Sequence, residues 1–155
     1  MWRGVSVLIL VVSMLVSQAQ AVELKGLVLY LPFDEGNGDV AYDLSGNGNN
    51  GKLVKNPKWV DGKIGKALEF DGSNYVEVPD SDTLDMEEQI TIAAWIFPKL
   101  KGSQWQGVVT KGLDARENYE LLINTDGFMH TGWLFDPGRV WANRGGAGTL
   151  SAEKW

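Results

Sequence analysis

Apolar and polar residues alternate in short runs along most of the chain, which is the period of a β-strand. Glycine, asparagine and aspartate cluster between the runs, as tight turns require. No segment keeps the 3.6-residue period of a helix, and residues 81–88 would form one helical turn at most. The pattern predicts an all-β sandwich with strands at 27–33, 67–70, 75–78, 90–97, 108–110, 119–124 and 128–135.

Two short turns predict hairpins. Residues 71–74 should join strands 67–70 and 75–78, and residues 124–127 should join strands 119–124 and 128–135. Strand 90–97 is apolar on both faces, so we expect it to be central and covered on both sides. Trp95, Ile92 and Leu29 are the side chains expected to be buried between the two sheets.

Residues 1–21 have the pattern of a secretory signal peptide. Arg3 precedes an apolar run at 5–16, and a small-x-small cleavage pattern, Ala19-Gln20-Ala21, follows it. A transmembrane anchor is the alternative, but the run is shorter than the roughly 20 residues that cross a bilayer. The sequence therefore predicts a secreted chain whose single domain spans residues 22–155, in an extracellular or cell-envelope location.

The charge balance is acidic, with a formal net charge of −6 that becomes −7 once Arg3 is removed with the leader. An acidic surface argues against nucleic acid and anionic membranes as partners. There is no cysteine, so the stability of the domain must come from its core, to which the six of the seven tryptophans that lie in residues 22–155 contribute, or from a bound metal.

A loop of oxygen-bearing side chains and glycines follows the first predicted strand. Residues 34–51 include four carboxylates and four asparagines, and no lysine or arginine. Oxygen is the ligand that Ca²⁺ takes, and glycine lets carbonyls converge on an ion. Asp34, Asp43 and Asn47 are the candidate ligands. The alternative is that Asp43 and Ser45 only form turns with nearby backbone N–H groups.

The spacing of this loop is not that of an EF-hand. Residues 43–48 match its opening, but the twelfth position is Val54 in place of glutamate, and no helices are predicted on either side.

Three tryptophans are candidates for ligand binding, because an exposed indole can stack on a sugar ring. They are Trp105, Trp133 and Trp141, which lie in or beside loops and late strands. The alternative is that they pack in the core, where tryptophan is usually found.

Five motifs occur in a characteristic order. They are Leu-x-Phe-Asp-Glu-Gly, Asp-x-Ser-Gly-Asn-Gly-Asn-Asn-Gly, Gly-Lys-Ala-Leu-Glu-Phe-Asp-Gly, Tyr-Val-Glu-Val-Pro and Ile-Thr-Ile-Ala-Ala-Trp-Ile-Phe-Pro. In this order, over about residues 27–155, the chain resembles the laminin-G-like jelly-roll domains of the concanavalin A-like lectin/glucanase superfamily. The resemblance implies a two-sheet antiparallel jelly roll that serves as an extracellular binding or adhesion module of a larger multidomain protein. It also implies a Ca²⁺ site near the rim of the sandwich.

The sequence departs from this family at its end. In relatives, a tryptophan corresponding to Trp155 opens a further strand, and later strands close the sandwich. The domain is therefore expected to be truncated at the C-terminus, with sheet edges left unpaired.

The residues do not predict catalysis. Retaining glucanases need two carboxylates about 5 Å apart, and no predicted strand carries such a pair. Glu69 and Glu77 are single acids on outer strands. His130 has no Ser or Cys in evident register, so a structural or surface role is expected.

The sequence thus predicts a secreted, non-catalytic module that recognises an extracellular glycan or protein, with Ca²⁺ as its candidate cofactor. One alternative is an accessory carbohydrate-binding domain of a larger secreted glycoside hydrolase or other enzyme. Another is a structural adhesion repeat that binds no small ligand.

Overall fold

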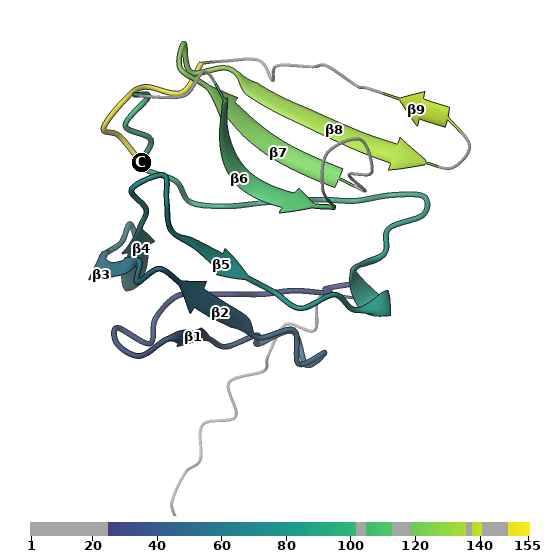
Figure 1. Ribbon diagram of the computed structural model, residues 1–155, viewed down its shortest axis with the longest axis horizontal. Helices are drawn as coiled ribbons and strands as arrows, with labels where there is room; N and C mark the ends of the chain where they lie inside the picture. The colour runs from purple at the N-terminus through teal and green to yellow at the C-terminus, as the bar shows by residue number, and fades with distance from the viewer. Residues whose placement is uncertain (1–24, 102–104, 113–118, 136–137, 141–148) are drawn as a thin grey trace, which may run out of the picture.

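The computed structural model describes residues 25–101, 105–112, 119–135, 138–140 and 149–155 (Figure 1). Over these residues the secondary structure consists of strands and one short 3-10 helix. They are β1 (Val40–Ala41), β2 (Gly51–Val54), β3 (Lys58–Asp61), β4 (Lys66–Glu69), β5 (Tyr75–Glu77), η1 (Asp82–Leu84), β6 (Trp105–Lys111), β7 (Tyr119–Asn124), β8 (Met129–Phe135) and β9 (Gly138–Val140). The all-β prediction is confirmed.

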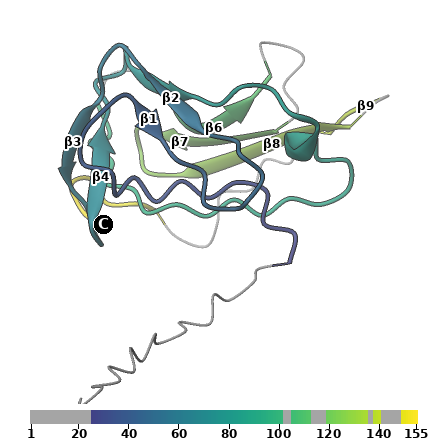
Figure 2. The ribbon, with the colours of Figure 1, turned by 90° about the horizontal axis from the view of Figure 1, so that it is seen from below.

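The strands form three antiparallel sheets. The first has the order β1-β2-β5, the second is the β3-β4 hairpin, and the third has the order β6-β7-β8-β9. Figure 1 places the third sheet above the first, and in Figure 2, seen from below, β1 and β2 overlap the third sheet. The chain thus has two layers, with the β3-β4 hairpin at one end. The jelly-roll order of strands stays a prediction.

The buried core is small and lies mainly around the first sheet and the hairpin. Ala41, Leu53 and Leu68 form its centre. Partly buried apolar side chains pack against this centre: Leu31, Phe33, Trp59 and Val76. On β7 the alternation of the strand buries Tyr119 and Ile123 on one face.

Segment 90–97, predicted as the central strand, is not a strand in the structure. It is extended, but no described residue pairs with it, and in Figure 1 it is part of the teal stretch that runs below β6. Trp95 is 65% exposed, and Ile92 is half-buried. The prediction of a buried Trp95 was wrong, because an apolar strand is covered only where neighbouring elements reach both of its faces.

The first predicted strand is also outside the sheets. Residues 27–33 are extended and half-buried at Leu29, and their backbone contact to the next segment is the bond from Leu44 N to Tyr30 O at 2.9 Å. Phe33 has φ +58°, a left-handed conformation that ends the extended run.

The pairing of two predicted strands differs from the expectation. β4 pairs with β3 and β5 pairs with β2, so the turn at 71–74 does not join a hairpin. Asp71 closes that turn by accepting hydrogen bonds from the backbone of Ser73 and Asn74 at 2.8 and 3.3 Å. The β7-β8 hairpin is confirmed, with its turn closed by Gly127 N and Asn124 O at 2.9 Å.

The predicted signal peptide at 1–21 lies outside the described residues. Among the residues that are described, no helix has the length and hydropathy needed to cross a bilayer.

Candidate functional site

The oxygen-rich loop is organised around the carboxylate of Asp43. Its Oδ1 accepts hydrogen bonds from the backbone N–H groups of Tyr30 and Ser45, both at 2.9 Å. Its Oδ2 accepts from the hydroxyl of Ser45 at 2.7 Å and from the backbone N–H of Asn49 at 2.9 Å. A carboxylate offers about four lone-pair sites, and these four donors use them all.

The bonds at Asp43 favour its ionised form. Partial burial by itself would raise the pKa of Asp43, but the hydrogen bonds from Tyr30, Ser45 and Asn49 outweigh burial and hold the pKa below its ordinary value. The group is therefore a charged acceptor that ties residues 30, 45 and 49 together. A cation at Asp43 would have to displace at least one of these donors.

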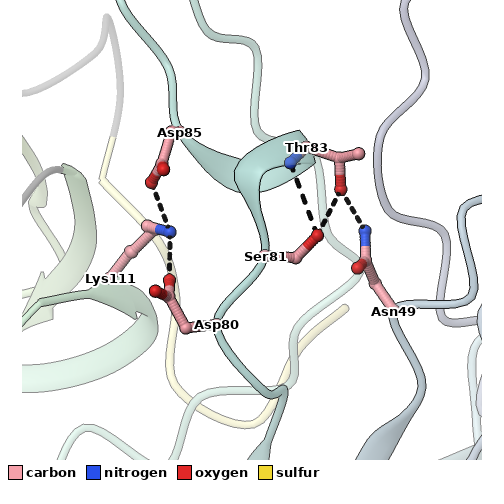
Figure 3. Close-up of polar contacts among 6 residues, drawn as sticks. All are labelled: Asn49, Asp80, Ser81, Thr83, Asp85 and Lys111. Atoms are coloured by element: carbon pink, nitrogen blue, oxygen red, sulfur yellow. Dashed lines mark hydrogen bonds and ion pairs between the residues drawn. The ribbon is translucent and has the colours of Figure 1, made fainter.

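Two asparagines complete the loop. The amide of Asn47 donates to the carbonyls of Leu27 and Val28 at 3.1 and 3.2 Å, and to Ser45 Oγ at 3.0 Å. Asn49 is buried, and its amide donates to Val28 O and to Thr83 Oγ1, both at 2.9 Å. Figure 3 shows how the second bond joins the loop to η1. These contacts fasten the loop to the preceding extended segment and to the 3-10 helix.

Asp34 forms its hydrogen bond with a different segment, at the start of β4. Its Oδ1 accepts a hydrogen bond from the backbone N–H of Lys66 at 2.8 Å, at the start of β4. The carboxylate sits against Gly65, where an added Cβ would lie 2.0 Å from Asp34 Oδ1 and where φ is +61°. Asp34 and Asp43 therefore bond to separate parts of the chain.

The structure does not assemble a cluster of metal-binding side chains here. No group of three or more His, Cys, Asp or Glu residues is placed to hold a metal within the described ranges. Glu35 is the one acid in the loop with a buried oxygen, Oε2, that has no hydrogen-bond partner in those ranges, while its Oε1 accepts from Tyr42 N at 2.7 Å. Calcium at Asp34, Asp43 and Asn47 stays a prediction, and the hydrogen bonds support the structural alternative of a closed turn.

The second candidate site is on one face of the third sheet. Antiparallel pairing sets Leu122 opposite His130, Glu120 opposite Gly132 and Trp105 opposite Asn124, and directly opposed residues share a face. Trp105, Glu120 and His130 therefore lie on the face opposite to the one that buries Tyr119 and Ile123.

The three side chains of this face are in contact. The rings of Trp105 and His130 are 4.9 Å apart and meet edge to face. His130 Nε2 lies 3.9 Å from Glu120 Oε1, an ion pair when the imidazole is protonated. Glu120 is 7% exposed and Trp105 is 43% exposed. On this face, a partly exposed indole, that of Trp105, therefore lies beside the imidazole of His130 and the buried carboxylate of Glu120.

The sequence pattern identified only Trp105 among these three. The turn at 124–127 is a signal that places Glu120 and His130 on one face, because a hairpin closed there pairs residue 122 with residue 130, but their position relative to Trp105 also depends on the register of β6. Of the other two predicted ligand-binding residues, Trp133 lies in β8, where its backbone pairs with Tyr119 and Val140. Trp141 lies outside the described residues.

No protein-family model matches this sequence, and no curated protein matches it. The fold is similar to the crystal structure of residues 221–444 of an S-layer domain-containing protein from Clostridium thermocellum ATCC 27405. The TM-score is 0.57 at 25% sequence identity, over 82% of this chain and 60% of the other. The present chain thus spans about three fifths of the length of that structure.

Proposed function

We propose that this chain is a non-catalytic binding module of a secreted or cell-envelope protein, with the laminin-G-like jelly roll as its fold. The support for an envelope setting is the likeness to the S-layer domain-containing protein, which extends over most of the chain. The two layers of antiparallel sheet are compatible with a sandwich.

We further propose that the ligand is a glycan and that it binds at the face formed by Trp105, His130 and Glu120. The observation that supports this is the exposure of Trp105 at the first residue of β6, where its backbone pairs with Asn124. Its ring contacts that of His130 edge to face. A sugar site combines an apolar surface with nearby polar groups, and here the imidazole of His130 is the polar group beside the indole, with the buried carboxylate of Glu120 next to it.

Affinity electrophoresis against a panel of soluble cell-wall and extracellular polysaccharides tests this proposal. A retarded migration with one of them should be lost with Trp105→Ala, with a weakening of about tenfold or more for the loss of one stacking contact. Tyr75→Ala is the matched control, because Tyr75 is 47% exposed on β5 of the first sheet. Equal weakening of binding by both variants, or binding that survives Trp105→Ala, would contradict a glycan site at Trp105.

An accessory domain of a larger secreted hydrolase is the second candidate. In either case the chain itself should not cleave polysaccharides. A retaining glycosidase needs two acids about 5 Å apart, and no predicted strand carries two acids at the spacing that would place them on one face. Release of reducing sugar by the purified chain, abolished by Glu120→Gln, would contradict this assignment.

A further inference from the structure

The backbone of the extended segment 90–97 is unpaired within the described part of the chain. No N–H or C=O group of these eight residues forms a hydrogen bond with another described residue. The sequence over the segment is Ile-Thr-Ile-Ala-Ala-Trp-Ile-Phe, with no charge, no glycine and no proline. Uncharged, β-prone segments with an open edge are templates for pairing with another strand.

The two exposed aromatic side chains of the segment share one face, and on the alternate face Ile90 is 37% exposed. Trp95 and Phe97 are 65% and 44% exposed, whereas Ile92 and Ile96 on the alternate face are half-buried. The C-terminal residues reach only the end of the segment, where Glu153 N bonds to Pro98 O at 2.8 Å and the ring of Trp155 lies 5.4 Å from that of Phe97. Within the described residues, the stretch 90–96 therefore combines backbone groups that form no hydrogen bond with an exposed apolar side chain, that of Trp95.

Charges at the two ends of the segment indicate what pairs with it. Glu87 and Glu88 precede it, Lys99 and Lys101 follow it, and all four side chains are exposed. Two copies paired antiparallel would set the acidic end of one against the basic end of the other. A parallel pair would set like charges side by side, which is unfavourable. Lys99 also pairs with Glu69, but an exposed ion pair of this kind is weak and exchanges readily.

We propose that a second copy of this chain is the partner: segment 90–97 of each copy adds to the other as an antiparallel strand around a two-fold axis. Such an isologous interface uses the same patch on both chains, so it is closed at two copies. It would satisfy the open backbone groups and bury Trp95 against the apolar segment of the partner.

Sedimentation velocity of the purified chain tests the dimer. We expect a dimer at micromolar concentrations and a monomer for Trp95→Lys, which puts a charge on the paired segment. Ile64→Lys is the control, because Ile64 is 73% exposed in the turn between β3 and β4 and should leave the dimer intact. A monomeric wild-type chain, or a dimer that survives Trp95→Lys, would overturn the proposal.

Charge reversal tests the antiparallel orientation without touching the apolar residues. The double variant Glu87→Lys/Glu88→Lys is basic at both ends, and Lys99→Glu/Lys101→Glu is acidic at both ends. Each alone should self-associate at least tenfold more weakly than the wild type, while their mixture should form a heterodimer. Circular dichroism of each variant reports on folding. Folded variants that dimerise as the wild type does, or that fail to pair when mixed, would overturn the arrangement.

Discussion

The side-chain amide of Asn49 donates a 2.9 Å hydrogen bond to the hydroxyl of Thr83, 34 residues farther along the chain. The same amide donates to Val28 O at 2.9 Å, and Asn49 is only 6% exposed. One buried side chain therefore connects the oxygen-rich loop, the extended segment before it and the 3-10 helix (Figure 3).

Replacing Asn49 should consequently destabilise the whole loop. Asn49→Ala removes two partly buried hydrogen bonds and leaves Val28 O without this donor, so we expect a loss of about 2 kcal/mol in the free energy of unfolding. Urea titration followed by tryptophan fluorescence measures it. Asn37→Ala is the control, since the exposed amide of Asn37 makes one bond of 3.4 Å to Glu35 O, and it should cost less than about 0.5 kcal/mol. Equal losses for both variants would contradict the role assigned to Asn49.

Asp43 should make stability depend on acidic pH. Its pKa in the folded chain lies below the ordinary value because of its hydrogen bonds, although burial opposes the shift. Its contribution is therefore fully present above about pH 4, the ordinary carboxylate range, and is lost as the pH falls through the lowered folded pKa. In Asp43→Asn this contribution is absent, so the stability difference from the wild type should be constant near neutral pH and shrink below about pH 4.

The pH series needs a variant with the same change of charge. Asp39→Asn lies in the same loop, and the side chain of Asp39 makes no hydrogen bond to the described residues. The difference in the free energy of unfolding between the wild type and Asp39→Asn should not follow the same pH dependence as the difference between the wild type and Asp43→Asn. Parallel curves for the two variants would show that net charge, and not the bonds at Asp43, determines the pH dependence.

The calcium prediction can be tested by thermal unfolding. An extracellular site of low ligand charge binds with a Kd of about 10⁻⁴–10⁻³ M, so about 5 mM Ca²⁺ should add about 1–2 kcal/mol by mass action. The melting temperature should rise by roughly 3–8 °C relative to a chelator. Asp43→Ala should remove the increment, whereas Asp71→Ala, in the turn before β5, should retain it. Identical melting curves with calcium and with a chelator would contradict the calcium site, and the loop would then be a structural turn.

Lys111 should link η1 to the third sheet. Its ammonium lies 2.7 Å from both Asp80 Oδ1 and Asp85 Oδ1. Figure 3 draws both contacts. Burial by itself would lower the pKa of Lys111, but the two carboxylates outweigh burial and raise it. Lys111→Met should cost about 1 kcal/mol in a urea titration, because both partners are solvated. Lys66→Met, which breaks the exposed pair with Asp61, should cost less, and the reverse order would contradict this assignment.

Local pattern was sufficient for part of the site. The turn chemistry of Asp43 and Ser45 was recognisable because an aspartate followed by serine and glycine bonds to its own backbone within a few residues. The roles of Asn49, Glu120 and His130 were not predicted. Asn49 donates a hydrogen bond to Thr83, which is 34 residues away in the sequence. The contact between His130 and Trp105 depends on the register of three strands.

What the sequence by itself determined is the class of structure. A period of two is a local property of the backbone, so alternation predicted an all-β chain and located β5, β7, β8 and the turn at Gly127. Strand pairing and burial are not local. The run at 90–97 has the most consistently apolar sequence, yet Trp95 is 65% exposed, whereas Ala41 in the two-residue β1 is fully buried. The tertiary structure decided both, because a side chain is buried only where other segments bring atoms to cover it.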